Sequence, residues 1–209
     1  MDITLKGKRA VVTGANSGIG EAIAMEFGAA GARVAVNYVV HPETADQVVQ
    51  RIKQAGGDAL AVKADVSDAA SVAAMFATLD GAWGGVDVLV NNAGIDGPRA
   101  AAWEADPAAW RRVLEINLIG AYTCAREALR RMIPARGGVI LNLTSVHERI
   151  PWTGYSAYTA SKAGLSMLTQ TLALEAAPSG VRVVAIAPGA IQTPISRDVW
   201  SNPETLADL

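Results

Sequence analysis

The sequence has little of what several classes of protein require. One of its 209 residues is a cysteine, so an internal disulfide is impossible, and Cys124 is interpreted as a small core residue. Two histidines without a cysteine pair supply no ligand set for a catalytic zinc ion. No apolar run reaches the roughly 18 residues that span a bilayer. The sequence therefore predicts a cytoplasmic protein without a metal site or a membrane span.

The sequence also lacks a large excess of positive or negative charge. The chain has 18 Lys and Arg against 20 Asp and Glu, which gives a formal net charge of −2 and no basic field for nucleic acid. Hydrophobic residues make up 51% of the chain and charged residues 18%, which suits a single domain over residues 1–209. We expect a small molecule as the partner.

Short β-branched runs alternate with long alanine-rich stretches that carry apolar residues at helical spacing. The predicted strands are Arg9–Thr13, Arg33–Tyr38, Ala59–Lys63, Val86–Asn91, Val139–Thr144 and Val181–Ala187. The predicted helices are Gly18–Ala30, Glu43–Gln54, Asp68–Ala82, Pro107–Met132 and Tyr155–Ala176. This order predicts a Rossmann-like, doubly wound α/β fold, with about six parallel strands and helices on both faces. In such folds ligands bind at the carboxyl ends of the strands.

The loop between the first predicted strand and the first predicted helix has the spacing G-x-x-x-G-x-G. Its glycines allow backbone N–H groups to approach a pyrophosphate at the helix N-terminus. A tight turn with close packing and no ligand is the alternative. The expected cofactor contacts in this loop are Thr13, Gly14, Asn16, Ser17, Gly18, Ile19 and Gly20.

Three further strand ends carry candidate cofactor contacts. Asp65 and Val66 follow the third strand, where the Asp65 carboxylate could accept a hydrogen bond from an adenine amino group. A capping or turn role for Asp65 is the alternative. Other expected contacts are Asn91, Ala93 and Gly94 after the fourth strand, and Pro188, Gly189, Ile191 and Thr193 after the sixth, where a lid is expected.

Tyr158 and Lys162 are spaced i and i+4, so both project from one face of a helix. An adjacent ammonium biases a phenol toward its ionised form. Bringing a pKa near 10 to about 7 takes roughly 4 kcal/mol, which this ammonium and a positively charged oxidised nicotinamide could supply together. A solvated pair is the alternative. Ser145, at the carboxyl end of the fifth strand, could donate to a substrate oxygen that gains negative charge. Asn117 lies inside a predicted helix, where its amide could hold a water that reaches Lys162; a solvated polar residue is the alternative.

These residues resemble the short-chain dehydrogenase/reductase family in its single-domain form. The family's glycine motif matches Thr13 to Gly20, its N-N-A-G motif matches Asn91 to Gly94, and its Asn-Ser-Tyr-Lys tetrad matches Asn117, Ser145, Tyr158 and Lys162. The resemblance implies metal-free hydride transfer between NAD or NADP and a secondary alcohol or carbonyl. Tyr158 would be the acid–base, Ser145 the donor to the substrate oxygen, Lys162 the cation beside Tyr158 and a ribose ligand, and Asn117 the anchor of a proton relay.

The stretches 145–152 and 188–195 look like those of bacterial glucose 1-dehydrogenases. This narrower resemblance implies oxidation of a sugar hemiacetal such as glucose, with His147 beside Ser145 and Tyr158 on the substrate side. A reductase of 3-oxoacyl thioesters and a non-catalytic NAD(P)-binding regulator are the alternatives. A methyltransferase with a similar glycine loop would leave Ser145, Tyr158 and Lys162 without a role.

The chain departs from the family pattern at two places. Tyr38 stands where an Asp would bind the ribose of NAD, and Val39 stands where an Arg would bind the 2′-phosphate of NADP. We therefore expect weak discrimination between the cofactors, with a slight preference for NAD. Only residues 190–209 follow Gly189, so we expect the family's last strand to be missing and the sixth strand to lie at a sheet edge. A homo-oligomer, dimer or tetramer, is expected if that C-terminal segment is present.

Overall fold

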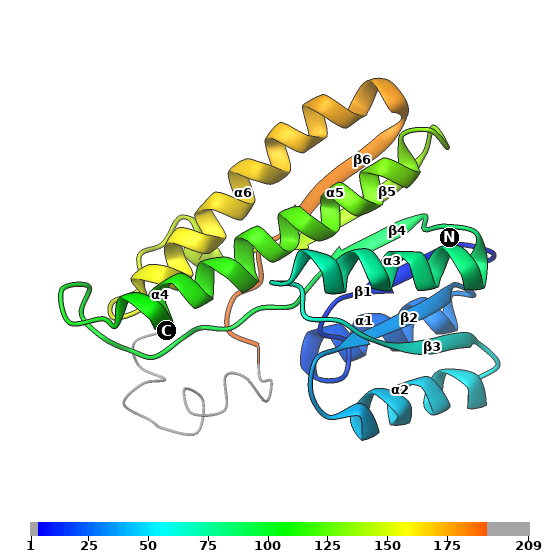
Figure 1. Cartoon of the computed structure of the whole chain (residues 1–209), viewed down its shortest axis with the longest axis horizontal. Coiled ribbons are helices and arrows are strands. Elements are labelled where there is room, and N and C mark those ends of the chain that lie inside the picture. Colours follow the sequence, from blue (N-terminus) through cyan, green and yellow to red (C-terminus); the bar gives the residue numbers. More distant parts are fainter. Residues whose placement is uncertain (1–3, 192–209) are drawn as a thin grey trace.

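The computed structural model describes residues 4–191, and in this part of the chain six parallel strands form one sheet in the order β3-β2-β1-β4-β5-β6 (Figure 1). The strands are β1 (Arg9–Val12), β2 (Arg33–Tyr38), β3 (Asp58–Lys63), β4 (Val88–Asn91), β5 (Gly138–Leu143) and β6 (Val181–Ile186). Ala10 of β1 pairs with Val34 on one side and with Val88 on the other. The strand order reverses direction between β1 and β4, which is where doubly wound sheets open a crevice for a ligand. The predicted fold is confirmed.

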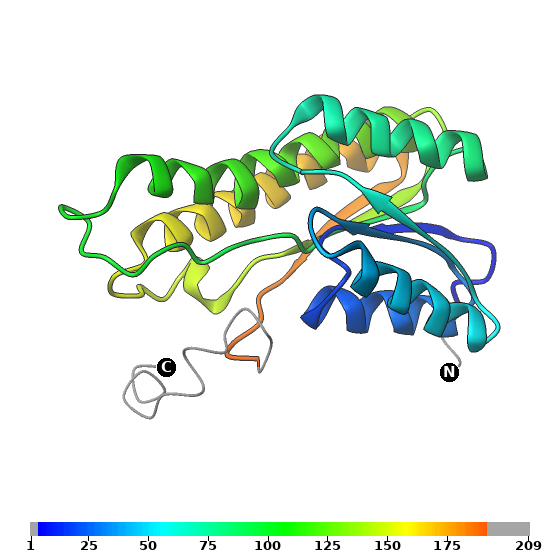
Figure 2. The same cartoon turned by 60° about the horizontal axis from the view of Figure 1, so that its bottom comes forward.

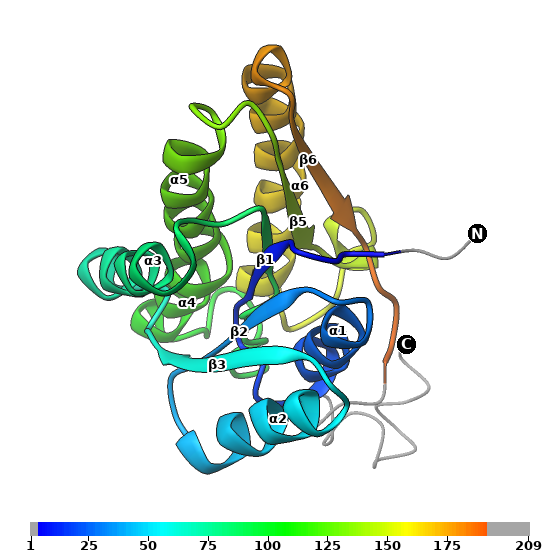
Figure 3. The same cartoon turned by 90° about the vertical axis from the view of Figure 1, so that its right-hand side faces the viewer.

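Helices cover both faces of the sheet (Figures 2 and 3). One layer holds α1 (Gly18–Ala29) and α2 (Pro42–Gln54), and the other holds α3 (Ala69–Trp83), α4 (Pro107–Leu114), α5 (Ala121–Met132) and α6 (Ser156–Ala176). Because successive strand residues point to opposite faces, Val11 and Val12 belong to different core clusters. Cys124 is buried in the first of these clusters, as predicted, and burial raises its thiol pKa to about 12.

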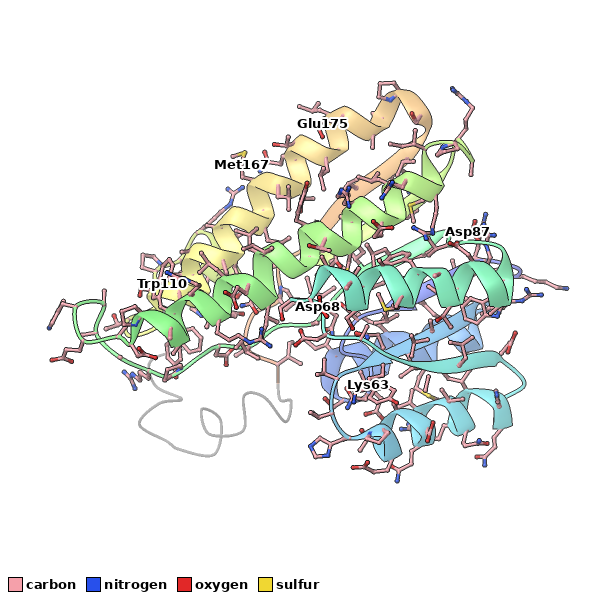
Figure 4. The ribbon with its side chains drawn as sticks, in the orientation of Figure 1. Lys63, Asp68, Asp87, Trp110, Met167 and Glu175 are labelled. Carbon is pink, nitrogen blue, oxygen red and sulfur yellow. The ribbon has the colours of Figure 1, made fainter. Side chains whose placement is uncertain are left out.

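Side-chain bonds fix α4 at its start, near the labelled Trp110, and join two strands at the opposite end of the sheet, at the labelled Asp87 (Figure 4). The Asp106 carboxylate accepts from the backbone N–H groups of Ala108 and Ala109, at 3.3 and 3.0 Å, and so caps α4 at its start. The indole N–H of Trp110 donates to Ser156 Oγ at 3.1 Å and ties α4 to the first turn of α6. At the opposite end Asp87 forms a two-pronged ion pair with Arg9, with both N···O distances 2.8 Å.

The predicted helix Pro107–Met132 is not continuous. A π-helical segment, Glu115–Gly120, separates α4 from α5, and the buried Asn117 lies inside it. A π-helical turn holds more residues than an α-helical turn, so it changes the direction in which its side chains point. Here it directs the Asn117 amide toward the backbone of Ile95, which follows β4. The apolar pattern of the sequence has no feature that marks such a widened turn.

The outer strand β6 differs from the expectation that helices bury it on both faces. Val181 and Val183 are buried, whereas Val184 and Ile186 are 44% and 52% exposed. The reason is that α6 packs on one face of β6, whereas α1 and α2 contact β1, β2 and β3. Within residues 4–191 β6 is an edge strand, as predicted. None of the helices in these residues has the length and apolar character needed to cross a bilayer.

Candidate active site

A cleft of about 470 Å³ opens where the strands end. Most of the predicted site residues line it: Gly14, Asn16, Ser17, Gly18, Ile19, Asp65, Val66, Ala93, Gly94, Ser145, His147, Tyr158, Lys162, Pro188, Gly189 and Ile191. The predicted residues Thr13, Gly20, Tyr38, Asn91 and Asn117 are not among the lining residues. Thr193 lies outside the described residues. The cleft thus joins a glycine-rich end near α1 to a polar end near α6.

The loop at the glycine-rich end is held by neutral side chains. Gly14 has φ +60°, and a Cβ built on it would lie 3.1 Å from Ala93 Cα. The Asn92 amide donates to the backbone carbonyls of Thr13 and Gly14, at 2.9 and 3.0 Å. A Cβ on Gly20 would overlap the Asn92 amide and the Gly14 carbonyl. Thus Gly20 serves the packing beneath the cleft, and Asn92 is a positioning residue that the sequence analysis did not single out although its motif was quoted.

Two more polar residues position this loop from below. The Thr13 hydroxyl accepts from the backbone N–H groups of Asn92 and Ala93, both at 3.0 Å. Asn37 is buried near the end of β2 and accepts from the Gly14 N–H at 3.1 Å. It donates to the carbonyl of Val62 in β3 and to that of Ala64, which follows β3. Sequence analysis missed Asn37, although a polar residue inside the apolar run of β2 was a visible signal.

The glycine-rich end fits a dinucleotide. Helix α1 begins at Gly18, and its N-cap residue Ser17 makes no side-chain capping bond. The Ser17 hydroxyl therefore does not compete with a ligand for the N–H groups of the first turn. The Asn16 amide instead ties the loop to Val40 O and Thr44 Oγ1, at 3.2 and 3.0 Å. Val39 and Val40 line the cleft and bring no charge, and Tyr38 is partly buried beside them.

Asp65 is held firmly at the end of the cleft near β3. Its Oδ1 accepts from the backbone N–H and the hydroxyl of Ser67, at 2.9 and 2.6 Å, and its Oδ2 accepts from Arg112 at 3.1 Å. Burial acts to raise the pKa of Asp65, but the bonds from Ser67 and Arg112 outweigh it and lower that pKa. The turn role that was the alternative for Asp65 is therefore present. Arg112 also lines the cleft and was missed by the sequence analysis.

Ser145, Tyr158 and Lys162 come together at the other end of the cleft. Ser145 lies just beyond β5, and Tyr158 and Lys162 lie one turn apart on α6. Lys162 Nζ donates to the carbonyl of Leu143 at 2.7 Å and lies 5.6 Å from the centroid of the Tyr158 ring. Ser145 is within hydrogen-bonding reach of Tyr158. Both Ser145 and Lys162 are buried, so this cluster is shielded from solvent.

Burial governs the electrostatics of this cluster, and the expectation that Lys162 and an oxidised nicotinamide together lower the pKa of Tyr158 stays a prediction. Burial raises the pKa of Tyr158, the hydrogen bond from Ser145 opposes the rise, and the charge of Asp96 adds to it. Burial also lowers the pKa of Lys162 to about 8, against a smaller raising effect of Asp96. The physical reason is that removing a charge from water costs more here than the Ser145 hydroxyl returns to Tyr158 or the Asp96 carboxylate returns to Lys162.

Asn117 and Asn91 have structural partners. The Asn117 amide donates to Ile95 O and Ser161 Oγ, at 2.9 and 3.1 Å, and its Oδ1 accepts from the Ile95 N–H at 2.9 Å. Both of its N–H groups are taken, so a bound water could use only the second acceptor position of Oδ1. Asn91 donates to Ala121 O and to Asn142 Oδ1 and points into the core. Asn91 is not among the residues that line the cleft, and its expected contact with a cofactor stays a prediction.

An aromatic stack forms the substrate side of the cleft. The rings of His147 and Trp152 are parallel with centroids 4.6 Å apart, and Trp152 also stacks on Tyr155 at 3.9 Å. The Trp152 ring meets Tyr158 edge to face at 5.8 Å. The backbone carbonyl of Ile150 lies 3.0 Å from His147 Nδ1. Both His147 and Trp152 line the cleft, so the structure places His147 on the predicted side.

The comparisons with known proteins agree with this geometry. Residues 8–204 match the family model of the short chain dehydrogenases, and the chain belongs to this family. It is 47% identical to 3beta-hydroxysteroid dehydrogenase 1 of Eggerthella lenta, covering 97% of this chain and 78% of that protein. It is 44% identical to glucose 1-dehydrogenase 2 of Bacillus subtilis, covering 90% and 74%.

Solved structures give the same result. The gluconate 5-dehydrogenase of Burkholderia cenocepacia, solved in complex with NADP and tartrate, superposes with a TM-score of 0.92 at 30% identity. The match covers 98% of this chain and 79% of that one. The protein is thus an NAD(P)-dependent oxidoreductase that acts on CH–OH groups and the corresponding carbonyls. Within residues 4–191 no group of three or more His, Cys, Asp or Glu side chains could hold a metal ion.

Proposed function

We propose that this protein oxidises a secondary alcohol, and in particular a sugar hemiacetal such as glucose, with Tyr158 as the acid–base. The observation that carries the proposal is the convergence of Ser145, Tyr158 and Lys162 at one shielded end of a cleft whose other end fits a dinucleotide. The similarity to a glucose 1-dehydrogenase supports the sugar as substrate.

The proposed cofactor contacts follow from the two ends of the cleft. Gly14 to Ile19 and the N-terminus of α1 would hold the pyrophosphate, Asp65 the adenine, and Lys162 the nicotinamide ribose. A nicotinamide cofactor held by these residues would supply the hydride acceptor for the oxidation and the hydride donor for the reverse reaction. Because Tyr38, Val39 and Val40 present neither a carboxylate nor a cation, we propose that both NAD and NADP are accepted, with a slight preference for NAD.

The chain's own residues then move the proton. In the oxidation the hydroxyl of the substrate gives its proton to the Tyr158 oxygen while the Ser145 hydroxyl donates to the substrate oxygen as it gains charge. Accepting this proton requires Tyr158 as the phenolate, which its raised pKa disfavours, and the positive charge of Lys162, 5.6 Å from the ring centroid, favours that form. In the reverse reaction the raised pKa of Tyr158 keeps its proton in place until the carbonyl oxygen receives it.

The test is Tyr158→Phe, assayed with glucose and a panel of small secondary alcohols under both cofactors. Turnover should fall about 10²- to 10⁴-fold because the acid–base is removed. Binding of NADH, followed by its fluorescence, should remain. Tyr122→Phe, on the exposed face of α5, serves as the matched control. Near wild-type turnover by a folded Tyr158→Phe protein would contradict the role of Tyr158.

A second candidate is the reduction of a 3-oxoacyl thioester. The raised pKa of Tyr158 favours it, because a phenol that retains its proton is suited to donate it to a carbonyl. Comparison of glucose with an acetoacetyl thioester, each under NAD(H) and NADP(H), separates the two candidates. Tight NADH binding without turnover of any alcohol or carbonyl would instead favour a nucleotide-binding regulator.

A further inference from the structure

One carboxylate at the reaction end of the cleft has no role in the chemistry described above. We propose that Asp96 selects the charge of the substrate: its carboxylate accepts a hydrogen bond from a second hydroxyl of an uncharged alcohol and repels an alcohol that carries a carboxylate. This inference rests on the proposed function, because it concerns the alcohol bound beside Tyr158.

The position of Asp96 is the first support. Asp96 lines the cleft together with Ser145, His147 and Tyr158. It follows Gly94, on which a Cβ would lie 3.7 Å from Lys162 Nζ, so this loop runs beside the buried ammonium. Within residues 4–191 the Asp96 carboxylate forms no ion pair within 4.0 Å and no hydrogen bond. It is therefore an acceptor available to a ligand.

The backbone around Asp96 is fixed before any substrate arrives. The Asn117 amide binds Ile95 through both its N–H and its carbonyl, each at 2.9 Å. On the other side Gly97 has φ +77°, and a Cβ there would come within 2.6 Å of Val113 Cγ2. A side chain held between two such constraints loses little conformational freedom when it binds, which makes it suitable for discrimination between ligands.

The electrostatic surroundings support an acceptor. Burial raises the pKa of Asp96, and the nearby Lys162 and His147 act against that rise. A partly desolvated carboxylate without a donor is costly, and a hydroxyl that donates to it recovers part of that cost. The Nδ1–H of His147 donates to the Ile150 carbonyl, so this donor is already engaged. Acceptors match the hydroxyls of a polyol and oppose a second carboxylate.

The test compares two substrates that share a ring and a reacting hydroxyl. These are cis-cyclohexane-1,4-diol and cis-4-hydroxycyclohexanecarboxylate, assayed with wild-type protein, Asp96→Asn and Glu104→Gln. Glu104 is exposed and lies outside the cleft lining. Glu104→Gln removes one negative charge from the same loop region, as Asp96→Asn does. We expect wild type to favour the diol in kcat/KM, and Asp96→Asn to lower the diol-to-carboxylate ratio about tenfold or more. Glu104→Gln should change that ratio less than about twofold.

The possible failures are distinguishable. An unchanged ratio in Asp96→Asn overturns the role of Asp96, while loss of turnover in Tyr158→Phe would still support the proposed function. If neither compound is turned over, calorimetric binding of both to the NADH-loaded protein gives the same comparison without chemistry. A relative affinity that shifts toward the carboxylate in Asp96→Asn supports the inference. An unshifted relative affinity, or binding of neither compound to wild type, overturns it.

Discussion

The two ends of the cleft are formed by different kinds of residue. At the end that fits the dinucleotide, glycines leave room, and neutral groups of Thr13, Asn37 and Asn92 hold the loop through hydrogen bonds to its backbone. At the reaction end the buried Lys162 lies beside the partly buried ionisable groups of Asp96 and Tyr158. One end thus depends on shape and the other on charge.

The two ends of the cleft therefore affect the free energy of folding in different ways. A buried amide whose hydrogen bonds are satisfied costs little, and its bonds do not change with pH. A buried ammonium costs free energy of folding, and groups of this kind occur most often at functional sites. We therefore expect substitutions at the first end to act through steric overlap, and substitutions at the second end to act through pH and charge.

The largest expected effect is on stability at the reaction end. The pKa of Lys162 is about 8 in the folded protein, below its ordinary value of 10.5. Between these two values the unfolded chain binds more protons than the folded one, so this group makes the free energy of unfolding rise with pH across that window. Across the whole window, the titration of Lys162 raises the free energy of unfolding by about 3 kcal/mol.

Lys162→Met removes this titration. The free energy of unfolding of Lys162→Met minus that of wild type should fall steadily between pH 8 and 10, since only wild type gains stability there. Urea unfolding of both proteins at each pH measures the difference, and other titrating groups cancel in it. A difference that stays constant over this range would show that Lys162 does not lose its proton early in the folded state.

A smaller effect is expected at the glycine end. Gly20→Ala places a Cβ against the Asn92 amide and the Gly14 carbonyl, which should cost about 1 to 3 kcal/mol of stability and weaken NADH binding. The control is Gly81→Ala on α3, where no atom lies within 4 Å of the new Cβ. That variant should gain about 0.5 to 1 kcal/mol because alanine favours a helix. Equal effects of the two substitutions on NADH binding would refute the steric argument.

The parts of this molecule that the sequence predicts are those that local rules determine. The strands, the helix start at Asp106 and the glycine loop depend on residue types within a few positions. The pairing of Tyr158 with Lys162 follows from one helical turn. These features were confirmed because each requires only the geometry of a single element and its neighbour.

The remaining features depend on tertiary structure. Asn91 and Asn92 are adjacent on a strand end, so they point to opposite sides, but the sequence does not tell which one faces the cleft. The π-helical segment around Asn117 has no distinct apolar period. The burial of Tyr158, which raises its pKa, is not revealed by an i and i+4 spacing.

The smallest expected effect concerns Arg112, which connects the two ends. Arg112 lies on α4, directly before the π-helical segment, and its guanidinium binds Asp65 at 3.1 Å. If Asp65 accepts from the adenine, Arg112→Gln should raise the KM for NAD about fivefold, the effect of about 1 kcal/mol. Nicotinamide mononucleotide lacks the adenosine half, so its kcat/KM should change less than about twofold, and Arg112→Lys should restore part of the loss. An equal loss with both nucleotides would instead mean that Arg112 acts through α4 on Asn117 and the reaction end, and not through Asp65 on the adenine.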